Sequence, residues 1–352
     1  MPRVFHIVVT DIFAGVERYV CDTASETAWR GWDVAVVGGD PDRMRASLGA
    51  DVRWEPGATP IEALRSIPRI GRWDVCHVHM TKAEGVAVVT RRAHRAAIVS
   101  TRHFAAKRGA SMAGHVVAPL IAAGITRELA IGEFVAAHLE RPPDAVVVSG
   151  VPESPCLWRV SNRMVLVLQR LESEKDTMTA LRAWRAARLI DEGWSLRIVG
   201  QGSERQTLER RVASEAIPGV TFTGWTDDVA AELQHAGILL ATAPAEPLGL
   251  AVLEAMAAGV PVVACASGGH LETVGLLADA PLFPPGDAAA AAAALRSLLA
   301  DSTRGRMSAA GRRLAAEHFT IEEHVDRLLV EYDAARAGRR RRRLRDVAVE
   351  SR

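Results

Sequence analysis

The amino-acid sequence predicts an α/β protein built from two doubly wound parallel-sheet domains. Three observations support this prediction: the chain has 352 residues, 49% of them are hydrophobic and 24% charged, and short apolar runs alternate with helical segments throughout. This length favours two domains, and the composition is that of an ordinary globular protein. Near-continuous apolar strands separated by helices are typical of parallel sheets that are covered on both faces.

The strands are predicted from β-branched runs, and the helices from amphipathic or alanine-rich segments between them. In the first half, strands are expected at residues 4–10, 33–38, 74–80, 98–102, 129–131 and 145–148, and helices at 17–30, 61–70, 83–93 and 134–139. In the second half, strands are expected at residues 165–168, 196–199, 220–223, 237–242 and 260–264. Residues 149–162 are rich in Pro, Ser and Gly, so we place the boundary between domains 1–155 and 156–319 there.

A last helix is expected over residues 320–336. Thr320 and Glu323 have the spacing of a capping box, and Ile321, Val325, Leu328, Leu329 and Tyr332 form one apolar stripe. Residues 337–352 are expected to form a disordered basic tail, because residues 339–352 contain seven Arg against Asp346 and Glu350. Three interpretations of this tail stay open: attraction to an anionic membrane surface at about 1 kcal/mol per basic residue, non-specific attraction to nucleic acid, and a purely solvated tail.

The chain is expected to be cytoplasmic, and its basic tail makes peripheral attachment to the inner face of the membrane one of the open possibilities. No signal peptide is recognised, and the apolar stretch at residues 112–125 is too short to span a bilayer. The four cysteines, Cys21, Cys76, Cys156 and Cys265, have no paired spacing and are expected to be free thiols. No specific nucleic-acid partner is expected.

The most informative segment is the turn between the predicted strand at 237–242 and the helix that follows it. Glu246 lies in this turn, and Glu254 lies in the helix, about 7–8 Å further along the axis. The backbone N–H groups of Leu248, Gly249 and Leu250 are the unpaired donors of the helix start, which attract phosphate. An anion held there would have a carboxylate on each side. A nucleoside diphosphate sugar has this layout, because its diphosphate lies between two hydroxyl-rich groups.

This turn, followed by residues 259–264 and by Gly268-Gly269-His270-Leu271-Glu272, resembles the signature region of family 4 glycosyltransferases. The resemblance extends over residues 1–335 and is strongest between Arg170 and Glu272. It implies the GT-B fold, in which two Rossmann-like domains face each other across a cleft and the C-terminal helix crosses back to the first domain. It also implies a retaining transfer from a UDP- or GDP-sugar, without a metal and without a covalent nucleophile.

The resemblance assigns roles to residues of the first half. Gly15 follows the first strand and opens a helix, as in the family's glycine-rich first turn, where a sugar or diphosphate approaches the backbone. His103, in Ser100-Thr101-Arg102-His103, matches the family histidine that faces the transferred sugar. His77 and His79 lie at a second landmark at the end of a strand, where we expect structural residues.

In the second half, Arg170 and Lys175 match the family's Arg and Lys pair, which would stabilise the departing diphosphate. The family's usual Gly before the Arg is Gln169 here. Gly200 and Gly202 resemble a turn beside the base and phosphate. Glu246 would accept the sugar hydroxyls and Glu254 the ribose hydroxyls. The expected catalytic residues are therefore His103, Arg170, Lys175 and Glu246, and the expected donor-binding residues are Gly15, Gly200, Gly202, Leu248, Gly249, Leu250 and Glu254.

Three alternatives remain beside this interpretation. Asp40 and Asp42 have the spacing that metal-dependent GT-A glycosyltransferases use, but they lie in a turn where Asp and Pro occur for backbone reasons. A GT-B-fold sugar-nucleotide 2-epimerase and a non-catalytic nucleotide-sugar-binding subunit share the expected architecture. The acceptor is expected to be a glycan, a lipid-linked sugar or a small-molecule hydroxyl.

Overall fold

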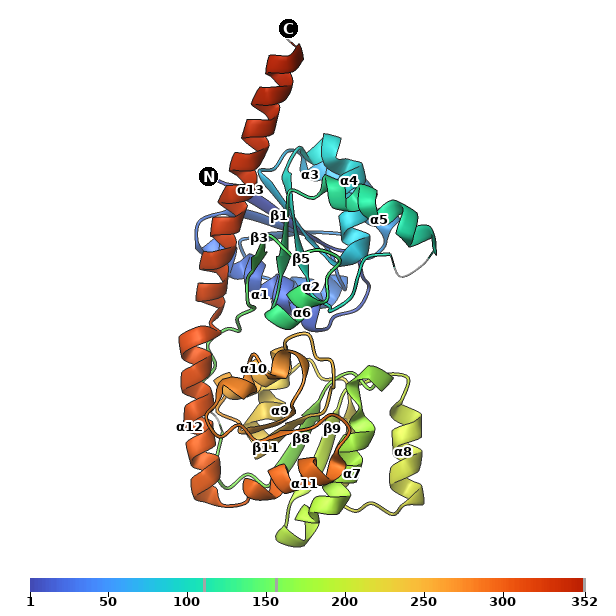
Figure 1. Ribbon diagram of the computed structural model, residues 1–352, viewed down its shortest axis with the longest axis vertical. Coiled ribbons are helices and arrows are strands. Elements are labelled where there is room, and N and C mark those ends of the chain that lie inside the picture. The colour runs from blue at the N-terminus through green and yellow to red at the C-terminus, as the bar shows by residue number, and fades with distance from the viewer. Residues whose placement is uncertain (110–111, 156–157, 351–352) are drawn as a thin grey trace. The chain divides into compact units, whose positions relative to one another are not determined.

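The computed structural model describes residues 1–109, 112–155 and 158–350, and it describes side chains over residues 1–109, 117–155 and 158–339. The chain forms two compact units. Unit 1 contains Met1–Pro152 and Ile321–Arg352, and unit 2 contains Glu153–Thr320. Each unit has a parallel sheet at its centre (Figure 1).

Unit 1 contains a seven-stranded sheet in the order β3-β2-β1-β4-β5-β6-β7. Its strands are β1 (Arg3–Val8), β2 (Asp33–Gly38), β3 (Val52–Glu55), β4 (Val75–His79), β5 (Ala97–Arg102), β6 (Arg127–Ala130) and β7 (Ala145–Val146). Its helices are α1 (Gly15–Trp29), α2 (Pro41–Ser47), α3 (Pro60–Ile70), α4 (Met80–His94), α5 (Met112–Gly124), α6 (Glu133–Ala137) and α13 (Ile321–Glu350). Every strand pair in this sheet is parallel.

The two faces of this sheet are covered by different helices. Alternate residues of a strand point to opposite faces, so Phe5 and Ile7 of β1 pack with residues of α3 and α4. His6 lies between them and belongs to the other face. On that face, α13 packs on α1 and on strands β4 and β5. The helix that the family resemblance assigns to the first domain therefore belongs to unit 1.

Unit 2 contains a six-stranded parallel sheet in the order β10-β9-β8-β11-β12-β13. Its strands are β8 (Met164–Leu168), β9 (Ser195–Val199), β10 (Val220–Gly224), β11 (Ile238–Ala241), β12 (Val262–Cys265) and β13 (Leu282–Phe283). Its helices are η1 (Ser173–Lys175), α7 (Thr177–Ala187), η2 (Leu189–Glu192), α8 (Arg205–Ser214), α9 (Val229–His235), α10 (Leu250–Ala257), η3 (Gly268–His270), η4 (Val274–Leu276), α11 (Ala288–Ser297) and α12 (Asp301–His318).

The sheet of unit 2 has an apolar layer on each face, and the sheets of both units have a topological switch point. Val165 and Trp184 belong to the core on the face of α7 and α11, whereas Leu166 and Met256 belong to the core on the face of α10 and α12. In both units the first strand lies between the second and the fourth, so the strand order reverses at β1/β4 and at β8/β11. Open parallel sheets bind ligands at the carboxyl ends of strands at such points.

The structure confirms the predicted pair of parallel α/β sheets and corrects some elements. The edge strands β3 and β13 were not predicted, because β3 has the mixed sequence VRWE and β13 has only two residues. The predicted disordered tail is wrong over residues 337–350, since α13 continues to Glu350. Arg, Leu, Ala and Glu are good helix formers, so the basic composition does not stop the helix.

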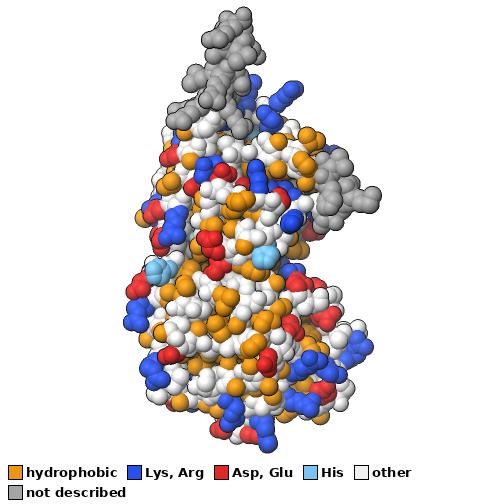
Figure 2. Space-filling view, in the orientation of Figure 1, with side chains coloured by type: hydrophobic (Ala, Val, Ile, Leu, Met, Phe, Trp, Pro, Cys, Tyr) orange, Lys and Arg blue, Asp and Glu red, His pale blue; other side chains and the backbone are white. Residues whose placement is uncertain are grey.

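Other expectations concern the surface and the thiols. Cys21, Cys76 and Cys265 are free and buried, as predicted, and Cys156 lies outside the described residues. Figure 2 shows Lys and Arg side chains interspersed with Asp and Glu on the visible face. Among the described residues, no helix combines the length and the apolar character that crossing a bilayer requires.

Candidate active site

The switch point of unit 2 brings together two of the predicted catalytic residues. The segment after β8 leads to Lys175 at the end of η1, and the segment after β11 carries Glu246. Lys175 Nζ lies 2.6 Å from Glu246 Oε2, and the two side chains are only 15% and 18% exposed. Because water reaches little of either side chain, this ion pair is more strongly held in one geometry than an ion pair between exposed side chains.

Gln169, where the family usually has Gly, connects the two segments. Its amide Nε2 lies 3.0 Å from the Lys175 carbonyl oxygen, 2.9 Å from Thr177 Oγ1 and 3.2 Å from Thr242 Oγ1. The buried Thr242 hydroxyl also donates to the Lys175 carbonyl, at 2.9 Å. These bonds fix the backbone of Lys175 to the residue that follows β11. Sequence reasoning did not find this role, because it depends on a contact across 73 residues.

The start of α10 has the features expected of an anion-binding turn. Gly249 has φ +94° and directly precedes the helix, a conformation that favours glycine. Within the described residues, the backbone amides of Leu248, Gly249 and Leu250 donate no hydrogen bond. The Leu248 side chain is buried and anchors the turn. Glu254 lies in the second turn of α10 and is half-buried.

The glycine pair after β12 holds the Glu246 segment in place. The Gly269 N–H donates to the Glu246 carbonyl, at 2.7 Å. A Cβ at Gly269 would lie 2.3 Å from Leu248 Cα, and one at Gly268 would lie 2.5 Å from the Glu246 carbonyl oxygen. These two backbones approach so closely that only glycine fits. The neighbouring His270 is buried, with Nδ1 3.1 Å from the Cys265 carbonyl oxygen. Burial lowers the pKa of His270, and this effect is larger than the rise caused by the negative charge of Glu246. The His270 imidazole is therefore neutral.

Gly200 and Gly202 also have a packing role. A Cβ at Gly200, whose φ is +143°, would lie 1.9 Å from the Gln169 carbonyl oxygen, and one at Gly202 would lie 2.3 Å from that of Leu171. Arg170 is 47% exposed and pairs with Glu174, at 2.7 Å. The Arg170 guanidinium therefore has a carboxylate partner of its own in this structure, and its role at a diphosphate stays a prediction.

The switch point of unit 1 carries a cavity of about 360 Å³. It is lined by residues that follow β1, β4 and β5, among them Thr10, Lys82, His103 and Phe104. His103 is almost fully buried in its wall. Gly15 is the first residue of α1, as predicted, and the preceding Ala14 N–H donates to the Glu17 carboxylate, at 2.8 Å.

One wall of this cavity, residues 104–107, is fixed by buried charges that the sequence did not reveal. Arg108 Nε donates to Glu84 Oε2 at 2.6 Å, and Arg108 Nη2 lies 2.5 Å from Glu128 Oε1. Arg102 bonds to Glu128 at 2.8 Å and to the Ala106 carbonyl at 2.6 Å. Burial alone would raise the pKa of Glu128, but its hydrogen bonds to the Arg108 and Arg102 guanidiniums keep that pKa below its usual value. Each of these arginine–glutamate contacts joins residues 20–26 positions apart, and no sequence pattern connects them.

His77 and His79 are fully buried, in agreement with the structural role expected of them. Asp40 caps α2, because its Oδ1 accepts the Arg43 N–H at 2.9 Å. This contact supports the interpretation of the Asp40–Asp42 spacing as a backbone feature.

The sequence profile of the family described as glycosyl transferases group 1 matches residues 157–314, a range that holds Arg170, Lys175, Glu246 and Glu254. Residues 157–314 thus contain a domain of this glycosyltransferase family. It is 28% identical over 340 residues to phosphatidyl-myo-inositol mannosyltransferase of Mycobacterium leprae, covering 86% of this chain and 88% of that protein.

Two further similarities are more limited. The 2-deoxystreptamine glucosyltransferase of Streptomyces kanamyceticus is 31% identical over 170 residues, which cover 47% of this chain and 43% of that protein. The match to this relative thus spans less than half of its length. The Anabaena protein HepE was solved in complex with UDP and glucose. Its structure superposes on this chain with a TM-score of 0.75 at 15% sequence identity, and the match covers 95% of this chain and 100% of HepE. At this identity the similarity shows the GT-B fold.

The contact between the glycine pair and the Glu246 turn generates a stability prediction. Gly269→Ala places a methyl group against the Leu248 backbone, and such overpacking costs about 1–3 kcal/mol. We expect a lower midpoint in denaturant unfolding for this variant. Gly305→Ala, in α12 where a Cβ meets nothing within 4 Å, is the matched control and should be as stable as the unsubstituted protein or more so. Equal midpoints for the two variants would contradict the proposed contact.

Proposed function

We propose that this chain is a retaining glycosyltransferase that moves a sugar from a nucleoside diphosphate sugar to an acceptor hydroxyl. The single observation that carries the proposal is the ion pair of Lys175 and Glu246 at the switch point of unit 2, on the segment that leads to the start of α10. The match of residues 157–314 to the glycosyltransferase family profile supports the same reaction class.

The ion pair has hydrogen-bonding capacity left for a ligand. Its bond uses Glu246 Oε2, so Oε1 can accept a sugar hydroxyl. Lys175 has three N–H donors, of which one points at Glu246, so the others can reach a phosphate oxygen. The departing diphosphate gains negative charge, which Lys175 and the amides at the start of α10 would stabilise without reorganisation. Arg170 would join them after release from the exposed Glu174.

Glu254 is proposed to accept the ribose hydroxyls, and Gly200 and Gly202 to border the base and phosphate. Retention would follow from attack on the face from which the diphosphate leaves, assisted by the leaving phosphate itself. Gly15 and His103 are proposed to contribute to sugar binding from unit 1. A divalent metal has no role in this proposal.

The acceptor is proposed to be lipid-linked and at an anionic membrane surface. The relative that aligns over most of both chains is named for a phosphatidyl-myo-inositol acceptor. In this chain the arginine run at residues 339–345 lies on α13, which continues from the core of unit 1 without a break. An anionic surface would attract such a basic helix.

A nucleoside diphosphate release assay tests the reaction class. We expect release from a UDP- or GDP-sugar to rise in proportion to an added lipid-linked acceptor and to persist in excess EDTA, because Lys175 and backbone amides supply the positive charge. A 2-epimerase would change the sugar without release, and a binding subunit would do neither. Loss of release on chelation and recovery with Mn²⁺ would contradict the metal-independent proposal.

The two carboxylates should differ in effect. Glu254→Gln removes a charged hydrogen bond to the ribose, about 1.5–3 kcal/mol, and should weaken donor binding about tenfold or more in calorimetry. Glu246→Gln should lower kcat more than donor affinity, because its proposed partner is the reacting sugar. Glu209→Gln, an exposed member of an ion pair on α8, is the control. Unchanged affinity and rate in both site variants would refute these assignments.

The basic end of α13 should govern membrane binding. Truncation after Gly338 should abolish co-sedimentation with vesicles that contain anionic phospholipid at low salt, because it removes the arginine run. Transfer to a water-soluble acceptor should survive, since the proposed site residues lie upstream. The control is neutral phosphatidylcholine vesicles, which should bind neither form. Equal binding of both forms to anionic vesicles would exclude this segment as the anchor.

A further inference from the structure

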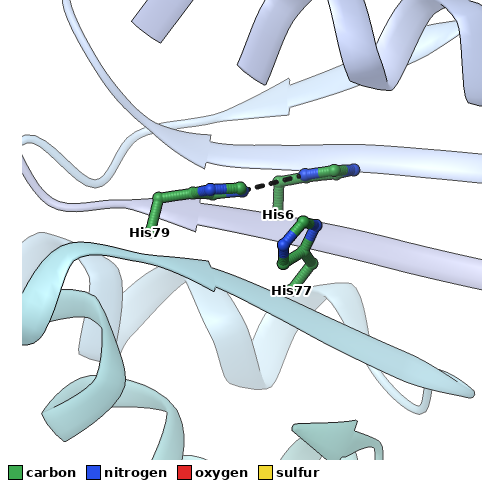
Figure 3. Close-up of side chains that lie close together, drawn as sticks. All are labelled: His6, His77 and His79. Carbon is green, nitrogen blue, oxygen red and sulfur yellow. Dashed lines mark hydrogen bonds between the residues drawn. The ribbon is translucent and has the colours of Figure 1, made fainter. Parts of the chain in front are cut away.

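Three histidines of unit 1 form a hydrogen-bonded row that ends at the cavity. His6 lies on β1, His79 at the end of β4, and His103 directly after β5. His6 Nδ1 lies 3.1 Å from His79 Nε2, the bond drawn in Figure 3, and His79 Nδ1 lies 3.0 Å from His103 Nε2. His6 and His79 are fully buried, whereas His103 lines the cavity. The row therefore connects the interior of the sheet with the cavity.

All three imidazoles are neutral. Burial lowers the pKa of His6 and His103 to about 3 and that of His79 well below its usual value. A neutral imidazole donates from one nitrogen and accepts at the other. His79 uses both nitrogens in the row, so when it donates to His103 it must accept from His6, and when it donates to His6 it must accept from His103. The two hydrogen bonds consequently point in the same direction.

The far end of the row decides that direction. His6 Nε2 is buried and, within the described residues, has no hydrogen-bond partner. If the bonds point inward, this nitrogen carries an N–H with no acceptor, whereas if they point outward it carries only a lone pair. Orphaned buried N–H groups are the rarer defect in folded proteins. The outward direction is therefore favoured, with protons on Nδ1 of His6, His79 and His103.

We propose that His6 and His79 are positioning residues that fix His103 as a neutral imidazole with its proton on Nδ1. His103 Nε2 is occupied by His79, so Nδ1 is the nitrogen left to reach a ligand in the cavity. An N–H donor without a positive charge suits a hydroxyl oxygen better than a phosphate. This inference rests on the proposed function only in naming that oxygen as one of the transferred sugar.

The side chains packed around the row leave its hydrogen bonds undisturbed. Tyr19 packs edge-on against His79 and His103, and His324 Nε2 bonds to the Tyr19 hydroxyl at 3.0 Å. His77 lies beside the row in Figure 3, but its two nitrogens lie 2.7 Å from Tyr332 Oη and 2.7 Å from Thr101 Oγ1. One ring nitrogen from each of His6, His77 and His79 lies within 4.8 Å of the other two, a spacing that also fits a metal ion. The experiment below therefore includes Zn²⁺.

A matched pair of substitutions separates the two bonds of His79. Asn places its amide near the position of Nδ1, so His79→Asn keeps a donor toward His103 and loses the bond to His6. Gln places its amide near the position of Nε2, so His79→Gln keeps the bond to His6 and loses the one to His103. Both variants have a polar amide in the same pocket, so a merely structural role would affect them alike.

The primary measurement is the histidine tautomer in the ligand-free protein, read from long-range ¹H–¹⁵N NMR of ¹⁵N-histidine-labelled chain. The His103 signals are assigned by their loss in His103→Gln. We expect protonated Nδ1 at His103 in the unsubstituted protein and in His79→Asn, and a tautomer mixture in His79→Gln. The spectrum of the unsubstituted protein tests the proposal even if a variant does not fold. A proton on Nε2 of His103, or Zn²⁺-induced shifts of His6 and His79, would overturn it.

Kinetics then connects the tautomer to the reaction. His79→Gln should lower kcat/KM for the nucleotide sugar about tenfold, the factor for one hydrogen bond, while His79→Asn should stay within about twofold. Equal losses in the two variants would contradict the positioning role. An inactive protein with the expected tautomers would refute the proposed function and leave the assignment of the His103 proton standing.

Discussion

The ion pair of Lys175 and Glu246 is the contact on which the site of unit 2 depends. Its two charges belong to segments that leave β8 and β11, the neighbouring strands at which the sheet order reverses. A lysine and a glutamate that are mostly removed from water each need a partner, so neither conformation is independent of the other. Gln169 fixes the backbone of Lys175, and Gly269 fixes that of Glu246. The charges are therefore held in position before any ligand arrives.

The glycines that follow β9 and β12 belong to motifs of the family and also lie where the backbone leaves no room for a side chain. Gly200 and Gly268 have positive φ, and at Gly200, Gly202, Gly268 and Gly269 an added Cβ would lie within 2.5 Å of another backbone atom. These positions let the segments after β8, β9, β11 and β12 approach closely. Gly200 and Gly202 pack against the segment that leads to Lys175, and Gly268 and Gly269 pack against the segment that holds Glu246. The glycines therefore help to position both segments whether or not a ligand touches them.

Much of this arrangement could be predicted from local sequence. The apolar runs predicted the central strands of both sheets, and the turn containing Glu246 predicted the start of α10. The edge strand β13 has two residues and no pattern that could indicate it. Gln169 and the cluster of Arg102, Arg108 and Glu128 depend on contacts between ordinary residues far apart in sequence. The end of α13 differs from the predicted disordered tail, because the helix propensity of its residues outweighs the repulsion within the arginine run.

The two switch points differ in their electrostatics, and the difference is consistent with the proposed reaction. Unit 2 presents a fixed ammonium and unpaired amides, which suit a diphosphate that gains negative charge. Unit 1 presents a histidine that burial keeps neutral. A sugar that leaves its diphosphate develops positive charge at its anomeric carbon, as in glycoside cleavage generally. A cationic imidazole beside that carbon would oppose the charge, whereas a neutral N–H donor can hold a hydroxyl without doing so. In the proposed reaction, burial of the row from His6 to His103 would therefore keep unit 1 from adding positive charge beside the sugar.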